Sequence, residues 1–225
     1  EVANFSKHEF KGPDARKFLD HIMAGRLPKP GRISLSPMLS YRGKLCGDLT
    51  VACLDENEFM VFGSGAVQEM HRRWFESHLD KFNLSYSNRS DEYHGLSIAG
   101  PNSRKVLEKI VRDDVSNEKF KFRDSRRMFV GGVPAIINRI SFTGELGYEI
   151  YVAPHYQLKL YEELMEAGKE FNIKPFGGRA LMSMRLEKNW GAWTLDYRPD
   201  FTAKETGLDA FINWDKEFIG KESAQ

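Results

Sequence analysis

The chain has 225 residues, of which 41% are hydrophobic and 29% charged, a composition typical of a folded, soluble protein. Lys and Arg total 33 and Asp and Glu total 32, so the formal net charge is +1. Such a balance offers no field of one sign to nucleic acid or to an acidic membrane, and we expect neither as a partner. The longest apolar runs, such as residues 133–137, are far shorter than the ~20 residues of a membrane-spanning helix.

The predicted elements alternate between short strands and helices. In the first half they are strands at residues 5–10, 33–39, 45–54 and 59–62, with helices at residues 13–22 and 66–79. In the second half they are strands at residues 96–99, 127–130, 133–142 and 148–152, with helices at residues 101–110, 154–171 and 178–188. The strands at 33–39, 45–54 and 59–62 predict a three-stranded meander, and Gly131-Gly132 predicts a hairpin turn.

Two of the helices have apolar positions at helical spacing, which predicts the face that each turns toward the core. In the helix at 66–79 these positions are Val67, Met70 and Trp74. In the helix at 154–171 they are Leu158, Tyr161, Met165 and Phe171.

A repeat organises the sequence, because residues 12–22 return as residues 100–110 with six of eleven positions identical. Each copy follows a short apolar stretch and has Pro where the first turn of a helix tolerates a missing N–H. Each therefore predicts a strand that leads into a helix. The spacing is too long for a solenoid and favours a duplicated α+β unit, with halves of residues 1–92 and 93–225. Two unrelated Gly-Pro helix starts are the alternative.

The two cysteines, Cys46 and Cys53, are seven residues apart. On one extended segment they point to opposite faces, so no disulfide is expected. The sequence has no Cys-x-x-Cys pair and no apolar leader, which suits a reducing compartment. We expect the cytoplasm, or the mitochondrial matrix in a eukaryote. The chain lacks an initiating methionine, and we expect a piece of a longer polypeptide.

The sequence contains no complete match to the common catalytic and cofactor motifs considered below. The six histidines form neither a His-x-x-x-His nor a Cys/His pair, so no metal is expected. Residues 62–66, Phe-Gly-Ser-Gly-Ala, only partly match the Gly-x-Ser-x-Gly nucleophile turn and lack the third glycine of a dinucleotide fingerprint. We interpret them as a strand-to-helix turn, and a Rossmann-type flavin site is not expected.

Two carboxylates lie on the polar side of predicted strands. Leu45, Leu49 and Val51 share one face, so Asp48 projects to the other. Likewise Glu149 projects away from the face that its two strand neighbours share. Either can line a cavity, but periodicity alone favours the alternative that both are simply solvated.

Four segments together carry a family resemblance: residues 12–15, 42–51, 142–149 and 185–188. In order and spacing they resemble the folate-binding aminomethyltransferase family, typified by the glycine-cleavage T-protein. Residues 26–32, 185–188 and 215–222 are more similar to the folate-binding half of dimethylglycine and sarcosine dehydrogenases. The resemblance implies an α+β fold of duplicated strand–helix units with antiparallel sheets, without the C-terminal β-rich domain of most members.

The resemblance also implies roles for the two carboxylates. Asp48 matches the family's aspartate beside the reacting folate nitrogens, where it stabilises positive charge and assists proton loss. Glu149 matches the family's pterin-binding glutamate, since one carboxylate can accept from N3–H and the 2-amino group together.

Four further positions are candidates for cofactor contact. Phe142 stands where the family commonly has Tyr, so ring stacking survives and a hydroxyl contact is lost. Arg185 matches a position near the folate, where it can meet a glutamyl carboxylate, or else form a local ion pair. Tyr148 and Trp193 can wall the pocket or simply pack in the core.

By resemblance, the chain binds tetrahydrofolate and transfers a one-carbon unit from a methylamine-derived imine to form 5,10-methylenetetrahydrofolate. The resemblance implies that FAD belongs to a domain absent from this chain. The expected partner is a flavin dehydrogenase domain. The alternatives are a T-protein-like aminomethyltransferase working with a lipoyl carrier protein, and a non-catalytic folate-binding module.

Overall fold

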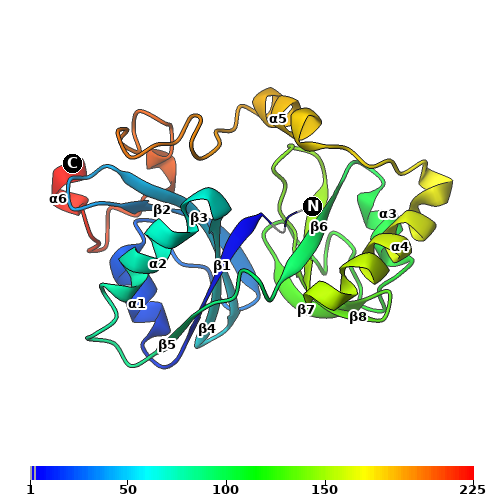
Figure 1. Ribbon diagram of the computed structural model, residues 1–225, viewed down its shortest axis with the longest axis horizontal. Coiled ribbons are helices and arrows are strands. Elements are labelled where there is room, and N and C mark those ends of the chain that lie inside the picture. Colours follow the sequence, from blue (N-terminus) through cyan, green and yellow to red (C-terminus); the bar gives the residue numbers. More distant parts are fainter. Residues whose placement is uncertain (1, 3) are drawn as a thin grey trace. The chain divides into compact units, whose positions relative to one another are not determined.

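A computed structural model describes residue 2 and residues 4–225. They form two compact units, both visible in Figure 1. The five-stranded unit contains residues 4–90 and 191–225, and the four-stranded unit contains residues 91–190 together with Val2. Each is described by itself below. No helix in the described part of the chain has the length and apolar character needed to cross a bilayer.

The five-stranded unit is an antiparallel sheet with two helices on one face. Its elements are β1 (Phe5–Lys11), α1 (Ala15–Ile22), β2 (Arg32–Leu39), β3 (Leu45–Asp55), β4 (Glu58–Ser64), α2 (Gln68–Glu76) and β5 (Ser85–Asn88). The strand order is β2-β3-β4-β1-β5, which confirms the predicted meander. Alternate strand residues such as Phe10, Leu49 and Val61 meet Phe18 of α1 and Phe75 of α2 in a fully buried core.

The inward face of α2 differs from the prediction. Met70 is 38% exposed, whereas His71 and Phe75 are buried. The prediction followed the apolar positions, but the core under α2 accepts an imidazole, because His71 hydrogen-bonds to the Cys46 carbonyl. Trp74 is partly buried at the edge of the same core.

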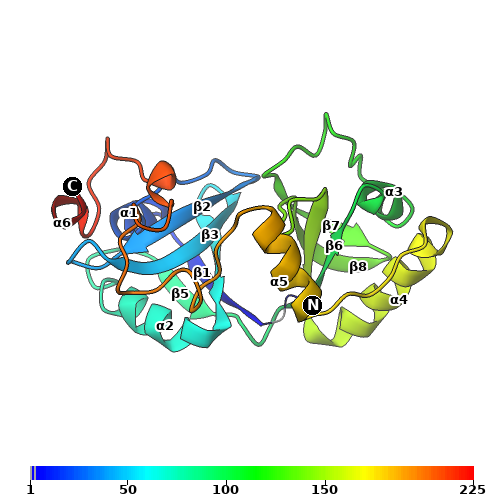
Figure 2. The same ribbon diagram turned by 90° about the horizontal axis from the view of Figure 1, so that it is seen from above.

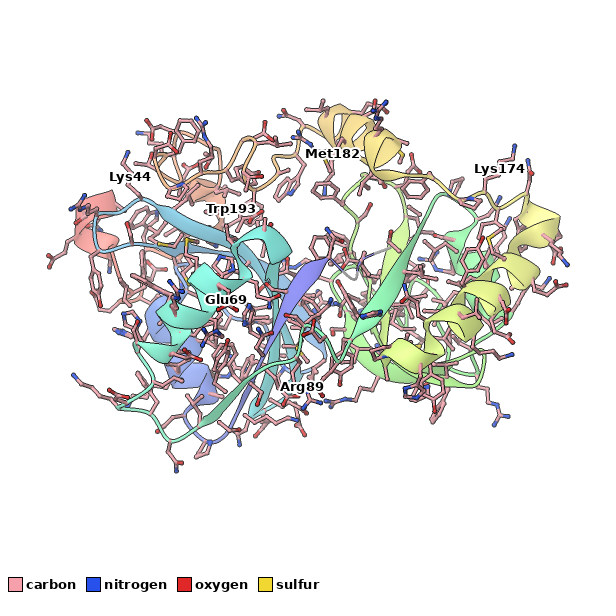
Figure 3. The ribbon with its side chains drawn as sticks, viewed as in Figure 1. Lys44, Glu69, Arg89, Lys174, Met182 and Trp193 are labelled. Carbon is pink, nitrogen blue, oxygen red and sulfur yellow. The ribbon has the colours of Figure 1, made fainter. Side chains whose placement is uncertain are left out.

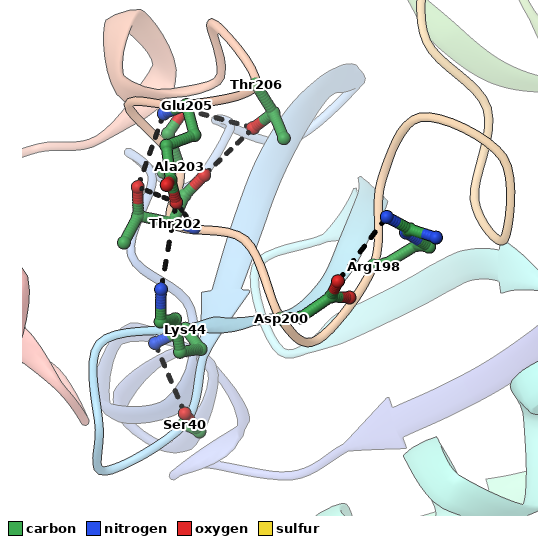
Figure 4. Close-up of polar contacts among 8 residues, drawn as sticks. All are labelled: Ser40, Lys44, Arg198, Asp200, Thr202, Ala203, Glu205 and Thr206. Atoms are coloured by element: carbon green, nitrogen blue, oxygen red, sulfur yellow. Dashed lines mark hydrogen bonds and ion pairs between the residues drawn. The ribbon is translucent and has the colours of Figure 1, made fainter.

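Residues 191–225 belong to the five-stranded unit and not with the rest of the expected second half, 93–225. Two backbone bridges fasten the segment, one between Gly25 and Ile212 and one between Lys44 and Thr202. Figure 4 shows the second attachment, where Thr202 lies against Lys44 at the turn between β2 and β3. The segment contains a 3-10 helix at Asp209–Phe211 and one short α-helix, α6 (Lys221–Ala224).

The four-stranded unit has the same layering. Its elements are β6 (His94–Ala99), α3 (Ser103–Glu108), β7 (Ser125–Val130), β8 (Val133–Asn138), β9 (Gly147–Val152), α4 (Gln157–Gly168) and α5 (Gly178–Glu187). The antiparallel order is β6-β9-β8-β7, and Figure 2 shows α3 and α4 on one side of the sheet. Gly131 and Gly132 both have positive φ, as a two-residue hairpin turn requires. The confirmed fold class is α+β with antiparallel sheets.

The inward face of α4 was also predicted wrongly. Leu158 is 68% exposed and Tyr161 41%, and the inward residues of the helix are Leu160, Leu164 and Ala167. Phe171, just after the helix, does pack against the core as predicted. Apolar residues occur on both sides of this helix, so helical spacing alone does not identify the side that meets β6. The predicted strand at 133–142 is shorter in the structure and ends at Asn138.

The repeated Gly-Pro segments have the same local geometry. Gly12 and Gly100 have φ of 136° and 128°, and in each copy the N–H three residues later donates to the glycine carbonyl at 3.0 Å. Each segment links a strand to a helix, β1 to α1 and β6 to α3, as predicted. That the two units arose by duplication stays a prediction.

Candidate functional site

Asp48 lies on β3, on the sheet face opposite the helices of the five-stranded unit. Leu49 and Val51 lie in the core under the helices and Asp48 is half-buried, as the strand alternation predicted. Leu45 is buried too, but the register slips between Leu45 and Gly47, so Leu45 pairs with Leu39 and does not join that core cluster. Burial raises the pKa of the Asp48 carboxyl to about 7. Among the described residues no Lys, Arg or His forms an ion pair with it. A carboxyl with a pKa near 7 can accept or release a proton at physiological pH.

Neither Pro37 on β2 nor Cys46 on β3 gives Asp48 a charged partner. Pro37 is its partner across the β2–β3 ladder and has no side-chain donor. Cys46, two residues earlier, is the extra residue where the β2–β3 register slips, and it packs against the core under the helices and not on the Asp48 face. It is half-buried, and burial raises the pKa of its thiol to about 11. Cys46 therefore stays a protonated thiol and is a poor nucleophile. Both cysteines are free thiols.

Trp193 comes from the loop after α5 and is labelled in Figure 3. It is 7% exposed, and its ring centroid is 6.3 Å from that of His71 on α2. Trp193 therefore packs within the five-stranded unit, the same unit that carries Asp48.

Glu149 lies on β9, an inner strand of the four-stranded sheet, on the face opposite α3 and α4. Strand register places Ser125, Asn138, Glu149 and Ser97 in one row across all four strands. The Tyr151 hydroxyl donates to Glu149 Oε2 at 2.8 Å. Burial and the nearby Glu149 raise the pKa of Tyr151 well above its usual value, so the phenol remains a donor. Glu149 is thus a carboxylate held by a fixed hydrogen-bond donor.

Asn138 is a polar residue that the sequence analysis missed. It is fully buried beside Glu149, and Ser125 Oγ donates to Asn138 Oδ1 at 2.7 Å. Its Nδ2 has no hydrogen-bond partner among the described residues, an uncommon condition for a buried amide. Only the strand register reveals that Asn138 is opposite Glu149, so no sequence pattern could have found it.

Tyr148 points the other way. It lies in the core of the four-stranded unit, 1% exposed, where its ring stacks on Phe120 with centroids 5.8 Å apart. Because successive strand residues face opposite sides, Tyr148 and Glu149 do not share a face. The structure thus does not bring Tyr148 to the polar row.

Phe142 and Arg185 lie near the ends of two segments that meet in the four-stranded unit. Phe142 is half-buried in the loop before β9, and Lys188 Nζ donates to the Ser141 carbonyl of that loop at 2.6 Å. Arg185, at the end of α5, is 5% exposed and donates from Nη1 to the Trp190 carbonyl at 2.8 Å. Lys188 therefore links the end of α5 to the loop that contains Phe142, and Arg185 links α5 to the residues that follow it.

The candidate residues thus form two groups, one in each unit. Asp48 and Trp193 lie in the five-stranded unit, and Glu149, Phe142 and Arg185 in the four-stranded unit. In the described part of the chain no three His, Cys, Asp or Glu side chains are arranged to hold a metal ion. Glu149 is an acceptor that Tyr151 holds in place, which suits a heterocycle with adjacent N–H donors, whereas Asn138 Nδ2 is itself a donor and would need an acceptor.

Comparison with known families decides the classification. The GCVT N-terminal domain family matches residues 1–216. The chain belongs to this family. Human mitochondrial dimethylglycine dehydrogenase is 37% identical over 228 residues, covering 99% of the chain and 26% of that protein. An aminomethyltransferase of Caldanaerobacter subterraneus subsp. tengcongensis is 30% identical and covers 99% of the chain and 60% of its own length.

Solved structures agree on the fold. The glycine cleavage system aminomethyltransferase T from Bartonella henselae superposes with a TM-score of 0.87 at 22% identity, over 99% of this chain and 60% of that one. Heterotetrameric sarcosine oxidase from Corynebacterium sp. U-96 matches with a TM-score of 0.61 at 19% identity, over 79% of this chain and 86% of that one. The chain therefore spans about a quarter of the dehydrogenase and about 60% of the aminomethyltransferases.

Proposed function

We propose that this chain binds tetrahydrofolate and accepts a one-carbon unit on it, as the folate-binding part of a dimethylglycine or sarcosine dehydrogenase-like enzyme. The observation that carries the proposal is the match of residues 1–216 to the GCVT N-terminal domain family. Asp48, whose pKa burial raises to about 7 and which has no cationic partner among the described residues, is the residue equipped for the chemistry. Buried, unpaired carboxyls of this kind are costly to stability and are concentrated at functional sites. The 37% identity to a dimethylglycine dehydrogenase favours that branch of the family.

In this proposal Glu149 recognises the pterin ring. Its carboxylate accepts from N3–H and the 2-amino group, which are adjacent donors on one edge of the ring. Tyr151 holds the carboxylate through the 2.8 Å hydrogen bond, so little rotamer entropy is lost when the ligand binds. Phe142 contributes ring stacking and Arg185 meets the glutamyl carboxylate. Trp193 supports the five-stranded unit by packing on His71, and Tyr148 is left out of the site.

Asp48 serves the transfer itself. The reaction converts an iminium ion and tetrahydrofolate into 5,10-methylenetetrahydrofolate, the free amine and one proton. Positive charge develops on nitrogen as it attacks the electrophilic carbon, and an ionised Asp48 stabilises that charge. Because its pKa lies near 7, Asp48 can also take the proton that leaves as the second C–N bond forms. FAD, in a separate domain, would supply the oxidation of the amine to the imine.

A T-protein-like aminomethyltransferase, which would receive its one-carbon unit from a lipoyl carrier protein, is the second candidate. It is favoured by the 30% identity to an aminomethyltransferase over 227 residues. A non-catalytic folate-binding module is the third. A mitochondrial relative at 37% identity supports a matrix location in a eukaryote.

A product assay separates these candidates. The full-length polypeptide is incubated anaerobically with tetrahydrofolate and either dimethylglycine with an electron acceptor or an aminomethyl-loaded lipoyl protein. We expect 5,10-methylenetetrahydrofolate from dimethylglycine, with little free formaldehyde. Product only from the lipoyl protein would favour the aminomethyltransferase, and folate binding with no product from either would favour the non-catalytic module.

A further inference from the structure

His71 fills a hollow above two glycines of the five-stranded sheet. A Cβ at residue 47 would lie 3.0 Å from His71 Nε2, and a Cβ at residue 63 would lie 3.1 Å from His71 Nδ1. Gly47 is on β3 and Gly63 is on β4, so the imidazole of α2 rests over both strands. Any side chain at residue 47 would push the ring away, because contacts this short force the neighbour to shift.

The hydrogen bond of His71 identifies its tautomer. Nε2 lies 3.0 Å from the Cys46 carbonyl oxygen, and a carbonyl can only accept. Nε2 therefore carries the hydrogen and Nδ1 is an unprotonated acceptor. That Nδ1 is buried and has no partner among the described residues. Burial lowers the pKa of His71 to about 4, so the ring is neutral at physiological pH.

The Cys46 carbonyl lies where the β2–β3 ladder is irregular. Met38 pairs with Gly47 and Leu39 pairs with Leu45, so Cys46 is an extra residue with no partner on β2. On the other side, the β3–β4 pairing begins only at Thr50. This arrangement is a β-bulge, a feature that re-aims nearby side chains and is common beside active sites.

We propose that His71 is a positioning residue that holds the β-bulge at Cys46 and thereby sets the direction in which Asp48 projects from β3. The catalytic consequence rests on the proposed function, but the structural role does not. The rings around His71 are His8, Phe75 and Trp193, each with its centroid 6.3 Å away. Since His71 lies on the core face and Asp48 on the other, His71 acts through the backbone and is not itself a catalytic residue.

The first test is nitrogen NMR of the wild-type chain with ¹⁵N-labelled histidine. We expect His71 to show a protonated Nε2 and an unprotonated Nδ1, unchanged from pH 8 to about pH 5. A charged ring at pH 6, or the other tautomer, would overturn the proposal. This arm needs neither a variant nor folate.

The second test compares His71→Asn, which keeps an N–H donor, with His71→Leu, which does not. Phe75→Leu, one turn along α2, is the control for lost packing. The readout is the titration of the Asp48 carboxyl, followed by ¹³C NMR. We expect His71→Leu to shift the midpoint of the Asp48 titration. The midpoints in His71→Asn and Phe75→Leu should lie much closer to that of the wild type. Equal midpoints in all four folded proteins would overturn the proposal. If His71→Leu does not fold, Gly47→Ala displaces the ring instead, and an unchanged midpoint there has the same meaning.

The third test is one-carbon transfer by the full-length polypeptide. We expect His71→Leu to lower kcat about tenfold with KM for tetrahydrofolate nearly unchanged, since misplacing a catalytic group slows chemistry more than binding. An unchanged kcat would contradict the catalytic consequence. If the wild type does not use tetrahydrofolate at all, the proposed function fails, while the two NMR tests still decide the role of His71.

Discussion

The two units share an architecture but prepare their carboxylates differently. Each has an antiparallel sheet with helices on one face and a single candidate carboxylate on the other. Glu149 lies in a regular inner strand, and Tyr151 holds it by a hydrogen bond. Asp48 follows a β-bulge, has no cationic partner in the described chain, and has a pKa raised to about 7 by burial. The two units share a fold, so the difference comes from the residues around each carboxylate. The hydrogen bond from Tyr151 prepares Glu149 to accept from a ligand, and burial prepares Asp48 to exchange a proton.

The largest effect expected is on the rate. Asp48→Asn keeps the size of the side chain but removes the charge and the proton acceptor. It should slow one-carbon transfer about 10²-fold or more, the scale of one acid–base or electrostatic contribution, and leave tetrahydrofolate affinity within a few-fold. Single-turnover formation of 5,10-methylenetetrahydrofolate measures this. Equal rates for variant and wild type would remove Asp48 from the mechanism.

The complementary change should affect binding. Glu149→Ala is expected to weaken tetrahydrofolate by about 2–3 kcal/mol, the usual cost of losing a charged hydrogen-bonding partner. Glu166→Ala is the matched control, because Glu166 is in the same unit and its side chain is 72% exposed. Equilibrium titration measures both. An unchanged affinity in a folded Glu149→Ala protein would contradict the pterin assignment.

Stability should depend on pH in a way that Asp48→Asn alters. The pKa of Asp48 is about 7 in the folded chain against an ordinary 3.8, so the folded state holds this proton more tightly. Its contribution to the free energy of unfolding therefore falls as pH rises from about 4 to 7. Above pH 7, Asp48→Asn should be more stable than wild type by about 1–2 kcal/mol, allowing for solvent screening. Urea denaturation at pH 5 and 8.5 tests this, and no gain at pH 8.5 would contradict it.

Two buried histidines should make the free energy of unfolding fall as pH decreases, which is opposite to the effect of Asp48. Burial lowers the pKa of His8 to about 3 and that of His71 to about 4, against an ordinary 6.5. The unfolded chain thus binds more protons in this range, and stability is lost as pH falls from about 6.5 toward 3–4. His71→Asn should flatten this acid limb in the same denaturation series. A limb of unchanged slope would show that His71 titrates normally.

The smallest expected effect is the loss of affinity when Glu149 no longer has its hydrogen bond from Tyr151. Tyr151→Phe removes the 2.8 Å hydrogen bond and should weaken tetrahydrofolate by about 0.5–1.5 kcal/mol. Tyr161→Phe is the control, because Tyr161 lies on α4 and is 41% exposed. It should leave the affinity unchanged. Equal affinities for the two variants would mean that Glu149 needs no support from Tyr151.

The strands were predictable because their signal is local. Alternation in β3 and β9 placed Asp48 and Glu149 on the polar faces, and the glycine pair at the β7–β8 turn fixed that hairpin. The inward faces of α2 and α4 were predicted wrongly, since both helices have apolar residues on more than one side. The choice between sides is made by the sheet beneath, as the burial of His71 illustrates.

The supporting residues could not be predicted because they depend on register. Asn138 adjoins Glu149 only through the β8–β9 ladder, and the bulge at Cys46 exists only where the β2–β3 pairing slips. Neither leaves a pattern in a single sequence. The family could be predicted from the sequence resemblance, but the residues that surround each carboxylate could be identified only from the structure.

The division of labour between Asp48 and Glu149 is tested most directly by anaerobic calorimetric titration of tetrahydrofolate into the wild-type chain, Glu149→Ala and Asp48→Asn. We predict micromolar binding by the wild type, affinity retained within a few-fold in Asp48→Asn, and a loss of about 2–3 kcal/mol in Glu149→Ala. Equal losses in the two variants, or binding that survives in Glu149→Ala and disappears in Asp48→Asn, would contradict the account.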